Sequence, residues 1–135
     1  MKGKKVLIMG VANERSIAWG ISQKLAEAGA ELAFTYLGDA LKKRVIPLAE
    51  KLNSKVTFSC DVEKKEEVVK LFEDIKSQWG EIDFVVHAIA FSDKSELSGE
   101  YLNIHPTILI YLRKLLHELR SQFYPILILY LQKVL

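Results

Sequence analysis

The feature that most constrains this sequence of 135 residues is a short apolar run that ends in a glycine. Residues 6–9 are Val-Leu-Ile-Met, Gly10 follows, and a helical pattern begins just after Ser16. Such a run is typical of a strand buried on both faces of a parallel sheet. A buried strand, a glycine loop and a helix that begins at a hydroxyl residue make a site where backbone N–H groups can face an anion. A diphosphate is the obvious candidate, although the loop lacks the common G-x-G-x-x-G spacing.

Strand and helix patterns then alternate along the first ninety residues. Further strands are expected at residues 31–36, 56–60 and 82–90, and helices at about 17–28, 38–52 and 64–79. Right-handed crossovers place the four strands in the order 3-2-1-4, so the sequence predicts an α/β fold, the Rossmann-like half of a doubly wound parallel sheet. The carboxyl ends of the first and fourth strands then flank a crevice where ligands bind.

Two of the expected helices carry features that can be checked. Ile17, Ile21, Leu25 and Ala28 recur at three- and four-residue spacing and predict the buried stripe of the first helix. Pro47 lies inside the second helical pattern, so we expect a kink or a late start there. The charge run at residues 63–67 is interpreted as the solvated face of the third helix.

The composition changes after residue 104. Residues 105–135 contain no alanine, glycine or aspartate, and their spacing predicts one amphipathic helix followed by a strand or a second helix. Charges interrupt this tail before an apolar run reaches the roughly 20 residues of a membrane span. We therefore divide the chain into residues 1–104 and a tail of uncertain, mainly helical structure at 105–135. The tail is expected to come from a shifted reading frame or a truncated gene.

The net charge and composition of the chain exclude several classes of function. A net charge of +2 gives no reason to expect nucleic-acid binding, and the N-terminal apolar run is too short for a signal peptide. Cys60 is the only cysteine, which fits a cytoplasmic protein, and it is interpreted as a small buried residue. His87 is interpreted as a core histidine, and His105 and His117 are not spaced as metal ligands, so no metal site is expected.

Five segments read together resemble one family. They are GVANERSIAWGI, GAELAFTY, LKKRVIPLAEKL, CDV and DFVVHAIAF, and they are similar to the N-terminal half of bacterial enoyl-acyl carrier protein reductases, which are divergent short-chain dehydrogenase/reductases. The resemblance covers about residues 2–104. It implies NADH-dependent reduction of a trans-2-enoyl group on acyl carrier protein in fatty-acid biosynthesis, and a homo-oligomeric enzyme.

The resemblance also implies roles for particular residues. Gly10, Ser16 and Ile17 would line the diphosphate. Asp61 would accept a hydrogen bond from the adenine amino group, while the Val62 N–H would donate to the ring. Ser16 and Asp61 have a simpler alternative, since each residue type is a good cap for the helix that follows it.

The remaining implied positions are Ile89, beside the ribose and nicotinamide, and Ser92, where the substrate pocket would begin. Leu37 departs from the family, because many members place a glutamine there, near the adenosine ribose. The strand before it lacks the acid that ordinarily selects NAD, and residues 42–44 are Lys-Lys-Arg. NADH is therefore expected, with NADPH possible.

No catalytic residue is assigned. The family's catalytic tyrosine and lysine lie seven positions apart, beyond the fourth strand, and only Tyr36 and Lys43 have that spacing here. They fall on the adenosine side of the expected fold, so the spacing is interpreted as coincidence. Activity of this chain alone is therefore doubtful. Two alternatives stay open: a nucleotide-binding remnant without catalysis, and another short-chain dehydrogenase.

Overall fold

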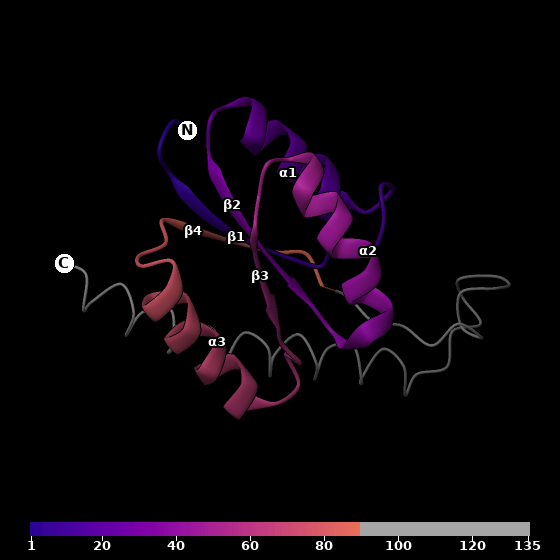
Figure 1. Ribbon diagram of the computed structural model, residues 1–135, viewed down its shortest axis with the longest axis vertical. Coiled ribbons are helices and arrows are strands. Elements are labelled where there is room, and N and C mark those ends of the chain that lie inside the picture. Colours follow the sequence, from indigo (N-terminus) through magenta and orange to yellow (C-terminus); the bar gives the residue numbers. More distant parts are fainter. Residues whose placement is uncertain (90–135) are drawn as a thin grey trace, which may run out of the picture. The chain divides into compact units, whose positions relative to one another are not determined.

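The computed structural model describes residues 1–89, which form one compact unit of seven elements (Figure 1). In chain order they are β1 (Lys5–Met9), α1 (Ile17–Glu27), β2 (Glu31–Tyr36), α2 (Gly38–Lys51), β3 (Val56–Ser59), α3 (Lys65–Gln78) and β4 (Phe84–His87). Ser92 and the tail at 105–135 lie outside the described residues, so the structure does not test the expectations for them.

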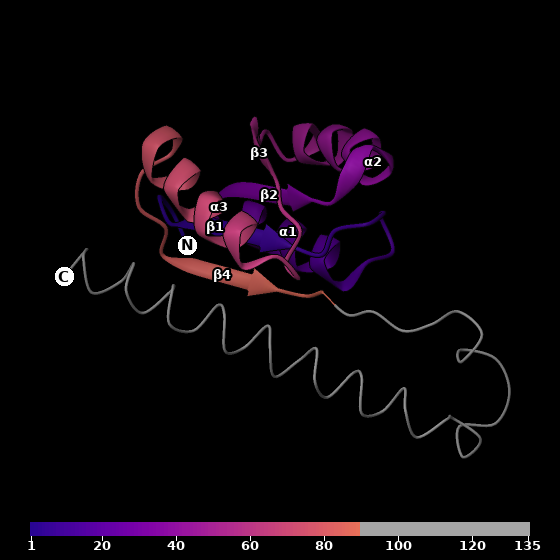
Figure 2. The same ribbon diagram turned by 90° about the horizontal axis from the view of Figure 1, so that it is seen from below.

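The four strands form one parallel sheet in the order β3-β2-β1-β4, which confirms the predicted fold class. Figure 2 shows β4 at one edge of this sheet and β3 toward the other. Residue pairs Ile8 with Phe34 and Met9 with His87 set the register of β1 against its two neighbours. Because the strands are parallel, all four carboxyl ends lie at the same end of the sheet. This carboxyl edge runs across the strands and is distinct from the edge strands.

Helices cover both faces of the sheet because successive residues of a strand point to opposite sides. In Figure 1, α1 and α2 lie together on one side and α3 lies on the other. Val6, Ile8 and Phe34 belong to the core cluster that α1 and α2 cover. Residues 6–9 are all fully buried, as the apolar run predicts.

The predicted buried stripe of α1 is wrong at three of its four positions, since Ala28 is exposed beyond the end of the helix and both isoleucines turn outward. Ile17 is 79% exposed and Ile21 is 37% exposed, whereas Ala18 and Ser22 are buried against the sheet. Ser22 can lie there because its hydroxyl donates a 2.6 Å hydrogen bond to the Ala18 carbonyl, which leaves no unpaired polar group. Trp19 is buried beside them, so the face of α1 toward the sheet is formed by Ala18, Trp19 and Ser22, and the two isoleucines turn outward.

Three other expectations differ from the structure. Helix α2 begins at Gly38 and contains the exposed Pro47, so of the two expected outcomes, a kink or a late start, the late start is excluded. Strand β4 is shorter than predicted, since it pairs with β1 only along Phe84–His87. His87 is exposed, so its interpretation as a core histidine is also wrong. Among residues 1–89, no helix has the length and apolar character needed to cross a membrane.

Candidate functional site

The first part of the site is the turn between β1 and α1, which depends on Gly10. Its φ of +103° is a conformation that residues with a side chain rarely adopt. A Cβ at this position would overlap the backbone carbonyl of Ala88, just beyond β4. Gly10 thus allows the carboxyl ends of β1 and β4 to approach each other, a role in the fold that is separate from any ligand.

Ser16 occupies the N-cap position of α1 but does not cap it. In the described structure its side chain makes no capping hydrogen bond; instead its hydroxyl donates to the Asn13 carbonyl at 2.5 Å, back into the loop. The first N–H groups of a helix have no partner within the helix. The simple interpretation of Ser16 as a side-chain cap is therefore wrong: its side chain bonds none of these N–H groups, and the Trp19 N–H donates to the Ser16 carbonyl at 3.0 Å.

Charge distinguishes the beginning of α1 from those of the other two helices. The first turn of α1 has no acidic residue, whereas α2 has Asp39 there and α3 has Glu66 and Glu67. The positive end of the helix dipole is therefore not offset by a carboxylate in the first turn of α1. Ile17, the first residue of this helix, is mostly exposed at the same place.

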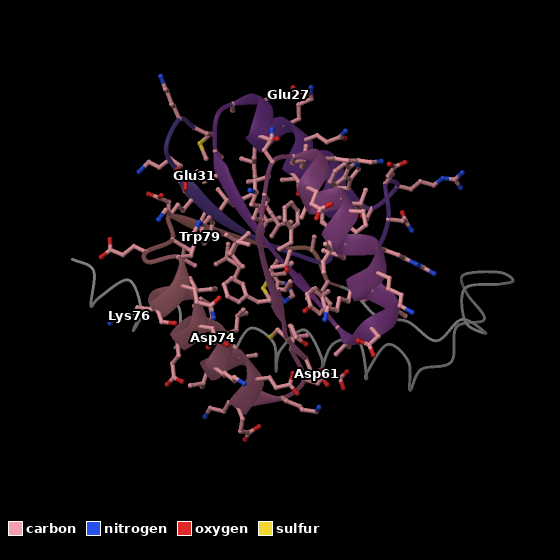
Figure 3. All side chains as sticks on the ribbon, viewed as in Figure 1. Glu27, Glu31, Asp61, Asp74, Lys76 and Trp79 are labelled. Atoms are coloured by element: carbon pink, nitrogen blue, oxygen red, sulfur yellow. The ribbon has the colours of Figure 1, made fainter. Side chains whose placement is uncertain are left out.

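The second part of the site follows β3, where Asp61 and Val62 join the strand to α3. Figure 3 shows Asp61 at the beginning of α3 and Trp79 at the other end of that helix. The Asp61 Oδ1 atom accepts a 3.1 Å hydrogen bond from the Glu63 N–H, outside the helix, while the N-cap residue is Lys64. Asp61 therefore closes a turn before α3 and does not cap the helix.

A carboxylate further along the chain completes this turn. The Glu67 Oε2 atom accepts the Asp61 N–H at 2.8 Å, and its Oε1 atom lies 3.0 Å from Lys64 Nζ. These contacts lower the pKa of Glu67, first through the Asp61 N–H and then through Lys64. The charge run was interpreted only as a solvated face, so the role of Glu67 was missed. An acid at the third position of a helix is the signal that could have indicated it.

Cys60 precedes this turn and is not available for chemistry. It is 4% exposed, as expected, and burial together with the Glu67 and Asp61 charges raises the pKa of its thiol to about 12. Val62 is also buried. Leu37 follows β2 at the same edge and is 52% exposed.

The structure therefore brings most of the predicted site residues to one edge of the sheet. Gly10, Leu37, Asp61 and Ile89 each follow the carboxyl end of a different strand. Ser16 and Val62 lie in the adjoining turns, and Ile17 begins α1. Ile89 is partly buried. A cavity of about 590 Å³ lies elsewhere, at the amino ends of β2 and β3, and is lined by residues such as Glu31, Lys55 and Trp79.

The fold and this edge define the chain as a Rossmann-like α/β protein. Comparison with known proteins narrows the class: the family model described as Enoyl-(Acyl carrier protein) reductase matches residues 10–110. The chain belongs to this family, which decides against the alternative of another short-chain dehydrogenase.

Individual relatives of the chain have the same family name. The enoyl-acyl-carrier-protein reductase (NADH) 1 of Rhizobium meliloti is 59% identical over 103 residues, which are 76% of this chain and 38% of that protein. The corresponding Rickettsia felis protein, FabI, is 44% identical over 126 residues, 90% of this chain and 48% of its own length. The second match runs past residue 104, where we expected the resemblance to end. The chain thus spans less than half the length of both relatives.

A solved structure shows the same arrangement. The enoyl-acyl-carrier-protein reductase of Anaplasma phagocytophilum, determined in complex with NAD, superposes with a TM-score of 0.78 at 44% sequence identity. The match covers 93% of this chain and 50% of that one.

Proposed function

We propose that this chain is the cofactor-binding part of an NADH-dependent enoyl-acyl carrier protein reductase. One observation carries the proposal. The beginning of α1, which has no acid in its first turn, lies at the same edge of the parallel sheet as the acidic turn at Asp61. The diphosphate would lie at the beginning of α1, near Gly10, Ser16 and Ile17. When bound, NADH would supply the hydride for reduction of a trans-2-enoyl group.

Adenine would be recognised by the polarity of its hydrogen-bonding groups. We place its amino group near the Asp61 carboxylate and a ring nitrogen near the Val62 N–H, which are an acceptor and a donor respectively. The Asp61 side chain is 18% exposed and therefore still accessible to a ligand. Ile89 would pass beside the ribose and nicotinamide, and Ser92 would begin the substrate pocket.

The preference for NADH over NADPH is a proposal drawn from the relatives that are named for NADH. Leu37 offers no hydrogen bond to the ribose, and its exposed side chain leaves an apolar surface there. Lys42, Lys43 and Arg44 are all exposed on α2 and could meet a 2′-phosphate. NADH is therefore the expected cofactor, and NADPH is the comparison that any binding measurement should include.

The substrate, partners and location of the whole protein are also proposals. The family name implies an acyl group carried on acyl carrier protein, and a cytoplasmic homo-oligomer fits the family. Nucleotide binding without reduction is a second candidate. It is favoured by the position of Tyr36, the only tyrosine of residues 1–89, which ends β2 on the adenosine side, away from the proposed nicotinamide position.

Two measurements on the full chain test the proposal. Titration with NADH, followed by nicotinamide fluorescence, should show saturable binding that ADP-ribose competes away. Addition of a crotonyl thioester then separates the candidates, since oxidation of NADH indicates reductase activity and binding without turnover favours the second candidate. Failure to bind NADH, NADPH or ADP-ribose would contradict both.

A further inference from the structure

Glu67 holds the turn that carries the proposed adenine contacts. In an ordinary capping box, the acid at the third helical position bonds the N–H of the N-cap residue. Here the N-cap is Lys64, yet Glu67 reaches three residues further back and accepts the Asp61 N–H at 2.8 Å. Its bond therefore fixes the backbone immediately before Val62, whose N–H is the proposed donor to the adenine ring.

The turn has other hydrogen bonds, but none of them involves the Asp61 N–H. Asp61 accepts the Glu63 N–H at Oδ1 and the Lys64 N–H at its carbonyl, each at 3.1 Å. Both bonds join Asp61 to residues that follow it. The bond from the Asp61 N–H to Glu67 is the one that ties the entry of the turn to helix α3.

Glu67 also competes with Asp61 for the Lys64 ammonium. Lys64 Nζ lies 3.0 Å from Glu67 Oε1 and 3.4 Å from Asp61 Oδ2. A good N–H···O bond spans about 2.7–3.2 Å, so Lys64 is closer to Glu67 than to Asp61 by a margin that matters. Removal of the Glu67 carboxylate would leave Asp61 as the nearer acid, and the ammonium would then occupy an acceptor that the adenine amino group needs.

We propose that Glu67 is a positioning residue for adenine recognition: it fixes the Asp61–Val62 backbone and holds Lys64, which also pairs with Asp61, closer to itself than to the Asp61 carboxylate. This inference rests on the proposed function, because it assigns Glu67 to the same subsite. Glu67 does not contact the nucleotide, so its effect should be confined to ligands that contain adenine.

The test compares binding of ADP-ribose, which contains adenine, with binding of reduced nicotinamide mononucleotide, which does not. Glu67→Ala should weaken ADP-ribose binding about tenfold, as expected for loss of a charge-assisted hydrogen bond, and leave the mononucleotide unchanged. Glu67→Gln keeps an acceptor for the Asp61 N–H but loses the charge that attracts Lys64, so it should recover only part of the affinity. Glu66→Ala is the matched control, because Glu66 occupies the same helical turn, and it should bind both ligands normally.

Asp61→Ala separates failure of this inference from failure of the proposed function. Normal ADP-ribose binding by Glu67→Ala, together with weak binding by Asp61→Ala, would overturn the role of Glu67 and keep the adenine subsite. Equal losses for both ligands in Glu67→Ala, or no recovery in Glu67→Gln, would likewise overturn it. If Asp61→Ala binds ADP-ribose normally, the adenine placement itself is wrong, and the role of Glu67 is overturned with it.

Discussion

The beginnings of α1 and α3 lie at the same edge of the sheet but differ in the acidic side chains that they carry. Helix α1 follows a glycine turn, has no acid in its first turn, and starts at a serine whose side chain faces away from the helix. Helix α3 follows Asp61 and has two glutamates in its first turn. Both helix dipoles present a positive end, so the difference comes from the side chains.

This difference explains how the carboxyl edge of the sheet can orient a ligand that has an anionic part and a neutral ring. An anion is favoured at α1, where the first turn of the helix has no carboxylate and the nearby Glu14 is paired with Lys51. At α3 the carboxylates would repel a phosphate, while Asp61 suits a neutral ring that carries an amino group. The proposed direction of the dinucleotide across the sheet follows from these two environments.

Gly10→Ala should have the largest effect, because it would disrupt the glycine turn that precedes α1. The new Cβ would have both an unfavourable φ and a collision with the Ala88 backbone. We expect the free energy of unfolding to fall by about 3 kcal/mol or more. Chemical denaturation of the full chain measures this.

Gly20→Ala is the matched control. Gly20 lies within α1, and a Cβ there would meet nothing within 4 Å. The helix propensity of alanine should stabilise the chain by about 0.5–1 kcal/mol. Similar losses in both variants would show that the close approach at Gly10 is not what the fold requires.

The acidic environment at α3 should also suppress the chemistry of Cys60. Its pKa rises from 9.0 to about 12, mainly through burial and further through Glu67 and Asp61. The thiolate fraction near neutral pH should therefore fall about a thousandfold. Reaction with a disulfide reagent should be very slow in the folded chain and fast in denaturant, and rapid reaction without denaturant would contradict the buried placement of Cys60.

A carboxylate introduced by Ile17→Asp would make the beginning of α1 resemble that of α3. Ile17 is mostly exposed, so the fold should tolerate the change, and an acid at this end should stabilise the helix by about 0.3–1 kcal/mol. Repulsion of the diphosphate should weaken NADH binding about tenfold. Calorimetric titration and thermal unfolding would show these opposite effects.

Ile17→Asn is the neutral control for that substitution, because it has similar size and polarity but no charge. It should bind NADH several times more tightly than Ile17→Asp. If the two variants bind NADH equally, charge at the beginning of α1 does not control binding. The difference in acidic residues between α1 and α3 would then not explain where the diphosphate binds.

The smallest effect concerns the protonation of Glu67. Its pKa is lowered by the Asp61 N–H and by Lys64, so its contribution to stability is present above the ordinary glutamate value of about 4.3 and is lost as the pH falls through the lowered value. A carboxyl NMR titration should place Glu67 below ordinary glutamates. Lys64→Met should raise the value, and an unchanged titration would contradict the contact with Lys64.

Much of the fold could be predicted from the sequence because its signals are local. The buried run at residues 6–9 and the alternation of strands with helices define a parallel sheet and its order. Periodicity failed in α1 because it favours the most apolar residues. The helix instead buries Ala18, Trp19 and Ser22, and the rotation of the helix about its axis that selects them depends on its packing in the folded chain.

The site was predictable only where chain order determines position. Residues that follow parallel strands meet at one edge, so Gly10 and Asp61 could be placed there. The contact between Glu67 and the Asp61 N–H depends on how the turn folds back over six residues, and the expected capping pattern has a shorter reach. Similarly, the outward position of the Ser16 side chain depends on the loop carbonyl of Asn13.

Backbone amide shifts on titration of the labelled chain with NADH test the central claim most directly. The account predicts the largest changes at Gly10, Ile17, Asp61 and Val62, along the carboxyl edge of the sheet. Changes confined to the opposite cavity, at Glu31, Lys55 and Trp79, would contradict it.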